Sequence, residues 1–348
     1  MALHGKMPDR RKALRLLLVI LKILVSVGLL YVVISKAGID KVSTMLQGIS
    51  IFYFLTACLM YIISIYLSSI RWQFFLPEGF RIKKLFSLYF IGSFFNNILP
   101  GIIGGDAVKA YYLNHEIRRT RATAEDEAVG MMKEGESPQN ASCITQPSND
   151  SSRNTSHSSL GVAVASVFMD RYIGFVALMA IGLIAYPFGL RYFRGSYIEW
   201  LMPLVVILFV TMSILLFGLR IGKRITFLSE LYHYFASYKG ERSILAKTFF
   251  ISLIVQISGI CAVYVISLGL RIEIPLLPLF IFIPIISTLT TIPLSISGIG
   301  VREASFVILF GCLGISSVQA TAISFGWFLS VVAGSLPGLF EYLRHKTR

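Results

Sequence analysis

The sequence predicts an all-α polytopic membrane protein, residues 1–348 forming one transmembrane domain, and three observations lead to this prediction. Hydrophobic residues make up 55% of the chain and charged residues only 14%, whereas soluble domains carry about 25% charged residues. Several apolar runs reach the roughly 20 residues that an α-helix needs to cross a bilayer. Two further apolar segments are interrupted by proline, glycine and charge, which is unusual at membrane depth.

About six full transmembrane helices are expected, together with two broken segments. Basic residues flank the outer ends of the first two spans, follow the fourth span and end the chain, which places these regions in the cytoplasm. We therefore expect a multi-pass protein of the cytoplasmic (cell) membrane with both termini cytoplasmic. The expected full spans cover residues 16–34, 51–70, 162–190, 200–219, 248–270 and 320–340.

The two broken segments, residues 85–113 and 274–313, are predicted to be re-entrant helical hairpins. Each must return to the side on which it starts if the basic flanks are cytoplasmic. A full crossing by the first segment is the alternative, and it places the basic cluster at residues 118–121 outside. The run 274–296 is also long enough to cross alone. The order span, span, hairpin, span then repeats upside down, an architecture found in secondary transporters.

A polar insert at residues 120–159 separates the first hairpin from the third span. It is rich in Ser, Asn, Thr and acidic residues, so we expect a disordered cytoplasmic segment. Three N-x-S sequons begin at Asn140, Asn149 and Asn154. They indicate either glycosylation of an exterior loop or chance in an Asn- and Ser-rich run, and the basic flanks favour chance.

The first break contains eight of the candidate substrate-binding residues. Proline frees a carbonyl upstream, glycines let the backbone turn and approach other elements, and exposed amides can meet an anion. The two asparagines either contact a headgroup or satisfy the loose backbone of the hairpin. Asp106 and Lys109 are three residues apart and share a helix face, so they can pair. The eight residues are Asn96, Asn97, Pro100, Gly101, Gly104, Gly105, Asp106 and Lys109.

The second break repeats this pattern with Pro293, Ser297, Gly298, Gly300, Arg302 and Glu303. Adjacent residues do not face one another on a helix, so we expect pairing across the two hairpins, Asp106 with Arg302 or Lys109 with Glu303. The alternative is that these charges lie in headgroup water and only fix topology. Because a charge at the bilayer centre costs about 2.5–3.5 kcal/mol on insertion scales, a functional role is favoured.

Asp170 and Arg171, at the entrance of the third span, are either a third polar element of the site or an interface anchor. No catalytic residue, metal or cofactor is expected, because the five histidines are scattered and the four cysteines show no C-x-x-C spacing. The formal net charge of +14 agrees with the positive-inside pattern and with binding to anionic lipid headgroups. The sequence contains no nucleic-acid-binding module, so no nucleic acid partner is expected.

The motifs Asn96 to Gly101, Gly104 to Lys109, Asp170-Arg171 and Gly298 to Glu303 resemble the lysylphosphatidylglycerol synthase transmembrane family. That family is the flippase-like membrane region of the multiple peptide resistance factor, and the resemblance covers nearly the whole chain except the insert. It implies an inner-membrane protein that moves or handles lipids, with the motif residues as the site. The soluble aminoacyl-transferase domain of the resistance factor has no counterpart before Arg348, so lysyl-transferase activity is not expected.

The expected function is therefore that of a lipid flippase or translocase, which moves a phospholipid or isoprenoid-linked lipid with a polar headgroup across the membrane. Two alternatives stay open. One is a membrane transferase that acts on a lipid-linked substrate, and the other is a carrier for a small anion or a proton-coupled solute. The substrate does not follow from the family, because relatives serve aminoacyl-phospholipid, isoprenoid-linked sugar or hopanoid pathways.

Overall fold

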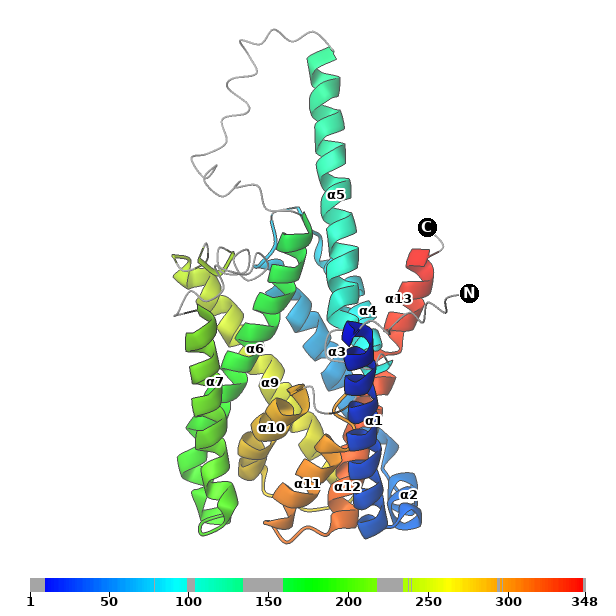
Figure 1. Cartoon of the computed structure of the whole chain (residues 1–348), viewed down its shortest axis with the longest axis vertical. Coiled ribbons are helices and arrows are strands. Elements are labelled where there is room, and N and C mark those ends of the chain that lie inside the picture. The colour runs from blue at the N-terminus through cyan, green and yellow to red at the C-terminus, as the bar shows by residue number, and fades with distance from the viewer. Residues whose placement is uncertain are drawn as a thin grey trace, which may run out of the picture.

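The computed structural model shows a bundle of helices and describes residues 10–77, 79–98, 104–133, 159–217, 234–236, 238, 240–292, 295 and 297–346. Every regular element in these ranges is an α-helix or a 3-10 helix (Figure 1). The first half contains α1 (Arg10–Ala37), α2 (Ile39–Gln47), α3 (Ile51–Gln73), α4 (Ile82–Ile98), α5 (Gly104–Lys133) and α6 (Ser159–Gly189).

The second half begins with two short 3-10 helices, and its helices α10 and α11 lie in the lower part of Figure 1. Its elements are η3 (Leu190–Tyr192), η4 (Tyr197–Trp200), α7 (Leu201–Phe217), α9 (Arg242–Gly269), α10 (Leu276–Thr291), α11 (Val301–Gly311), α12 (Ser317–Ser335) and α13 (Pro337–Lys346).

Five helical stretches of the described residues are long and apolar enough to cross a membrane, and they correspond to five of the six expected spans. The sixth, α7, is apolar but has only 17 residues in the described part. Large apolar side chains on these helices face outward, among them Leu24, Phe52, Ile207 and Phe250. Such a surface is unusual in water and is suited to lipid, which agrees with a polytopic membrane protein.

Each broken segment forms a pair of packed helices, α4 with α5 and α10 with α11. The first pair crosses at two glycines, because a Cβ atom added to Gly105 would lie 1.9 Å from the carbonyl oxygen of Gly92. Figure 1 shows α4 and α5 in the upper part of the bundle and α10 and α11 in the lower part. This agrees with two oppositely directed hairpins. Their re-entrant position in a bilayer stays a prediction.

Residues 120–133 of the predicted disordered insert are helical, since α5 continues as one helix to Lys133. The prediction is therefore wrong for residues 120–133. This stretch contains Ala, Glu, Met and Lys, which are good helix formers, and it extends a helix that has already begun. Residues 134–158, including the three sequons, lie outside the described residues.

Two apolar cores support the bundle on different sides. The larger core is built mainly from α9, α10, α11 and α12 and includes Ile266, Phe282 and Phe306. The smaller one joins α3, α4 and α5 and includes Trp72 and Leu113. Each hairpin is thus held by its own apolar core, so its polar residues can be positioned with little freedom.

Candidate functional site

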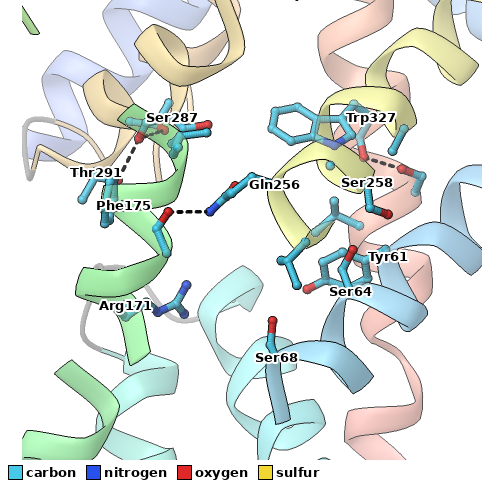
Figure 2. Close-up of a pocket in the computed structure, with 18 of the residues that line it drawn as sticks. Tyr61, Ser64, Ser68, Arg171, Phe175, Gln256, Ser258, Ser287, Thr291 and Trp327 are labelled. Atoms are coloured by element: carbon cyan, nitrogen blue, oxygen red, sulfur yellow. Dashed lines mark hydrogen bonds between the residues drawn. The ribbon is translucent and has the colours of Figure 1, made fainter. Parts of the chain in front are cut away.

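A central cavity of about 400 Å³ lies among α3, α4, α6, α9, α10 and α12 (Figure 2). Both hairpins reach it, the first through Tyr89 and the second through the end of α10. Two arginines, Arg71 and Arg171, are on its wall, together with Tyr61 and Gln256. Its hydroxyl-bearing lining residues are Ser64, Ser68, Ser258, Ser287, Thr290, Thr291 and Ser330. The cavity therefore combines charged and hydroxyl groups with apolar side chains such as Phe175 and Trp327.

Asp170 is fully buried and organises the first charged group of the site. Arg71 Nε donates to its Oδ1 at 2.8 Å, Tyr89 Oη donates to its Oδ2 at 2.9 Å, and Lys109 Nζ lies 3.8 Å from Oδ2. These partners come from α3, α4 and α5, while Asp170 itself is on α6. We call Arg71, Asp106, Lys109, Asp170 and Arg171 the Asp170 cluster.

Asp106, in the first turn of α5, pairs with Arg171 of α6. The guanidinium Nε and Nη2 donate to the two carboxylate oxygens, each at 3.0 Å. The Arg171 side chain is 45% exposed and that of Asp106 17%. A carboxylate at the start of a helix also interacts favourably with the helix dipole. Asp170 and Arg171 thus pair with charged residues of the first hairpin, and Arg171 lines the cavity, while their role as site residues stays a prediction.

Lys109 is the most enclosed cation of the site, with 1% of the residue exposed. Its ammonium lies 3.6 Å from the ring centroid of Tyr89 and 4.5 Å from that of Trp72. Among the described residues Nζ has no hydrogen-bond partner. Gly92 makes room for it, because a Cβ atom there would lie 2.3 Å from Lys109 Cγ.

The second charged group, Glu303 with Arg302 and Ser324, is local to α11 and α12, and we call it the Glu303 cluster. Arg302 Nε donates to Glu303 Oε1 at 2.9 Å, Ser324 Oγ donates to Oε1 at 3.3 Å, and Gly300 N donates to Oε2 at 2.7 Å. Glu303 therefore caps its own helix, which starts after Gly300 with φ 85°. The guanidinium of Arg302 also stacks 4.3 Å from the Phe328 ring centroid.

Both predicted pairings across the hairpins are wrong. Asp106 binds Arg171 rather than Arg302, and Lys109 lies beside Asp170 rather than Glu303. The expectation that neighbouring side chains on a helix do not meet also fails here. Helical side chains lean toward the N-terminus, and the long Arg302 chain bends back over the first turn to reach the capping carboxylate.

The remaining predicted residues that the structure describes make structural contacts or shape turns. Asn96 Oδ1 accepts from Gly105 N at 3.0 Å, so it satisfies the hairpin backbone, and Asn97 Nδ2 donates to Ser335 Oγ at 3.1 Å. Ser297 and Gly298 have positive φ and shape the turn before α11. Gly104 begins α5. Pro100, Gly101 and Pro293 lie outside the described residues.

Sequence reasoning missed Arg71 and the hydroxyls of the cavity. Arg71 is 3% exposed, and its Nη1 donates to Ser252 Oγ at 2.8 Å, which ties α3 to α9. Arg71 directly follows the expected span 51–70, so it counts among the basic residues that place this end in the cytoplasm. Trp72 and Phe74, however, continue the apolar run beyond it. Ser64 and Ser68 are four residues apart and share one helix face, a spacing that predicts a polar stripe within a span.

Comparisons with known proteins agree with the helical architecture. The family model described as "Lysylphosphatidylglycerol synthase TM region" matches residues 19–125 and 152–338. The UPF0104 membrane protein PH1989 of Pyrococcus horikoshii is 36% identical over 98 residues, or 27% of this chain and 29% of the relative. The UPF0104 membrane protein MJ1595 of Methanocaldococcus jannaschii is 32% identical over 98 residues, or 26% and 29%.

The matched stretch thus covers less than a third of either archaeal protein, and no solved structure matches the chain. The family model, in contrast, covers most of the chain, from within α1 to the start of α13, and leaves out residues 1–18, 126–151 and 339–348. The chain is therefore a multi-pass membrane protein that belongs to the lysylphosphatidylglycerol synthase TM region family.

Proposed function

We propose that this protein is a lipid translocase of the cell membrane, with both termini cytoplasmic, which takes the polar headgroup of a phospholipid or isoprenoid-linked lipid into the central cavity. The observation that carries the proposal is a cavity of about 400 Å³ that is lined by two arginines and several hydroxyl groups, within a bundle whose outer surface is apolar. Its volume lies in the roughly 300–1,000 Å³ range of small-molecule sites. A headgroup fits such a space while the acyl chains stay in the bilayer.

The arrangement of the hairpins supports alternating access as the mechanism. One hairpin reaches the cavity with α4 and the other with α10, and the two lie in the upper and lower parts of the bundle (Figure 1). Inverted repeats of this kind move by rocking one half against the other around a fixed site. The headgroup would then meet one side of the membrane at a time.

A membrane transferase is supported less well by the same residues. A transferase needs a carboxylate free to act as a general base. Asp106 is held by Arg171, Asp170 by Arg71 and Tyr89, and Glu303 by Arg302, Ser324 and the backbone of Gly300. These contacts favour a binding site over a reacting one.

The test is movement of a fluorescent phospholipid in vesicles that contain the purified protein. Ser64→Trp fills the cavity, whereas Leu59→Trp adds the same side chain to the exposed face of α3. We expect translocation by the wild type and by Leu59→Trp, and its loss in Ser64→Trp. Thermal unfolding confirms that both variants fold. Wild-type rates in Ser64→Trp, or solute flux without lipid movement, contradict the proposal.

A further inference from the structure

Deepening the proposed function, on which it rests, we propose that the cavity recognises the phosphate group of an anionic lipid and that Arg171 is the side chain that contacts it. The proposal comes from the charge of the cavity wall. Among the described lining residues the charged ones are Arg71 and Arg171, and none is a carboxylate. A headgroup that enters this space therefore meets two guanidinium groups.

The cluster behind the wall has unequal charge. The Asp170 cluster contains three cations, Arg71, Lys109 and Arg171, and two carboxylates, Asp106 and Asp170. The two arginines make short carboxylate contacts, whereas Lys109 lies 3.8 Å from the Asp170 carboxylate that Arg71 also contacts, so the cluster carries one positive charge in excess. Because an uncompensated charge at membrane depth is costly, an anion in the neighbouring cavity would stabilise the cluster.

Lys109 is a second observation that points to a ligand. Its ammonium is buried without a hydrogen-bond partner in the described part, and it lies against Tyr89, which lines the cavity. It does not reach the cavity itself. Its positive field is little screened so far from water, and it favours negative charge in the neighbouring cavity that Tyr89 lines.

Arg171 is the guanidinium that is available for contact. Arg71 donates to Asp170 and to Ser252 and is 3% exposed, so it is fixed in place. Arg171 uses two donors on Asp106, and its side chain is 45% exposed. Arginine has five N–H donors in a planar fork that matches phosphate oxygens. Figure 2 shows the Arg171 guanidinium directed into the cavity, with Ser68 and Ser64 across from it.

The opposite wall suits the rest of such a headgroup. Tyr61, Ser64 and Ser68 offer hydroxyl groups across from Arg171, and Ser287 and Thr291 offer more at another end of the cavity (Figure 2). A phosphate next to Arg171 would leave glycerol or sugar hydroxyls within reach of these groups. The site therefore selects by phosphate charge and accepts a polar headgroup beyond it.

Equilibrium binding to the full-length protein in detergent micelles tests this recognition. The probes are phosphatidylglycerol, diacylglycerol as the same lipid without phosphate, and inorganic phosphate as the free anion. We expect phosphatidylglycerol to bind at least about tenfold tighter than diacylglycerol, the scale of one charge-assisted contact. Equal binding of the two lipids overturns the proposal. Inorganic phosphate binding as tightly as phosphatidylglycerol shows a free anion as the ligand and also overturns it.

Three variants locate the contact. Arg171→Gln is expected to lose the preference for phosphatidylglycerol, and Arg171→Lys, which keeps the charge but not the fork, to lose only part of it. Arg191→Gln removes an exposed arginine of η3 outside the cavity and is expected to bind as the wild type. An unchanged preference in Arg171→Gln overturns the assignment, and if this variant does not fold, an unchanged preference in Arg171→Lys does so.

The binding assay does not depend on lipid movement, so the two proposals fail separately. Phosphate-dependent binding through Arg171 without movement in vesicles contradicts the translocase and keeps the recognition site. Movement of lipids at equal rates with and without phosphate, and with and without Arg171, contradicts the recognition site and keeps the translocase.

Discussion

The Asp170 cluster and the Glu303 cluster come from matching sequence motifs, yet they are built differently. The Asp170 cluster takes side chains from α3, α5 and α6, and its Asp170 carboxylate accepts a hydrogen bond from Tyr89 of α4. It contains three cations and two carboxylates, and it borders the cavity. The Glu303 cluster uses α11 and α12, pairs one cation with one carboxylate, and caps a helix. Similar motifs in the two halves therefore do not imply similar roles.

Under the proposed function, charge balance would separate a binding site from a structural contact. In the Glu303 cluster the charges of one arginine and one carboxylate balance, so no ligand is needed to neutralise them. A group with excess positive charge next to a cavity is not neutralised by its own residues, and an anionic ligand can supply the missing negative charge. Three substitutions can break or sharpen this contrast.

The largest effect is expected for Asp170→Asn. This change leaves the cations of Arg71 and Lys109 buried without their carboxylate, and breaking a buried pair costs about 3–5 kcal/mol. We expect a large loss in the free energy of unfolding, measured by denaturation in micelles, and little folded protein. Glu273→Gln, which changes an exposed carboxylate, is the control. Wild-type stability in Asp170→Asn would mean that the cluster does not hold the helices together.

Glu303→Gln is expected to reduce stability less and to spare transport. The amide oxygen can still accept from Gly300 N, so the loss is that of charged contacts with Arg302, about 1.5–3 kcal/mol. Denaturation measures the loss, and vesicle assays normalised to folded protein measure transport. Folded Glu303→Gln that no longer moves lipid would give the Glu303 cluster a functional role and remove the contrast.

Asp106→Asn is expected to have the smallest effect on stability. It should strengthen the binding of phosphate and slow the transport of lipid. The pair with Arg171 is partly exposed, and such pairs are worth about 1 kcal/mol or less. Arg171 released from Asp106 should hold phosphate up to roughly fivefold tighter, and slower release should reduce translocation. Binding is measured in micelles and transport in vesicles. Weaker binding in Asp106→Asn contradicts the competition between Asp106 and the ligand.

The sequence was sufficient to predict the helical class, five spans and the two segments that form helix pairs, because apolar length and helix-breaking residues determine these features locally. It did not predict the ion pairs, since the partner of Asp106 or Lys109 depends on how α5 is rotated against α3 and α6. Arg71 was missed because basic residues near span ends usually indicate topology. The helix over residues 120–133 was not predicted because the stretch is polar, although its residues have high helix propensity and it continues a helix that has already begun.

Asp170 also limits which parts of the protein can separate. Its carboxylate contacts Arg71 of α3, Tyr89 of α4 and Lys109 of α5. Separating these helices from α6 would therefore leave the buried charges without their partners. Arg71 also donates to Ser252 of α9, so α9 is tied to the same group through a neutral hydroxyl. Under the proposed function, α3, α4, α5 and α6 would therefore move together as one rigid unit around Asp170 during transport.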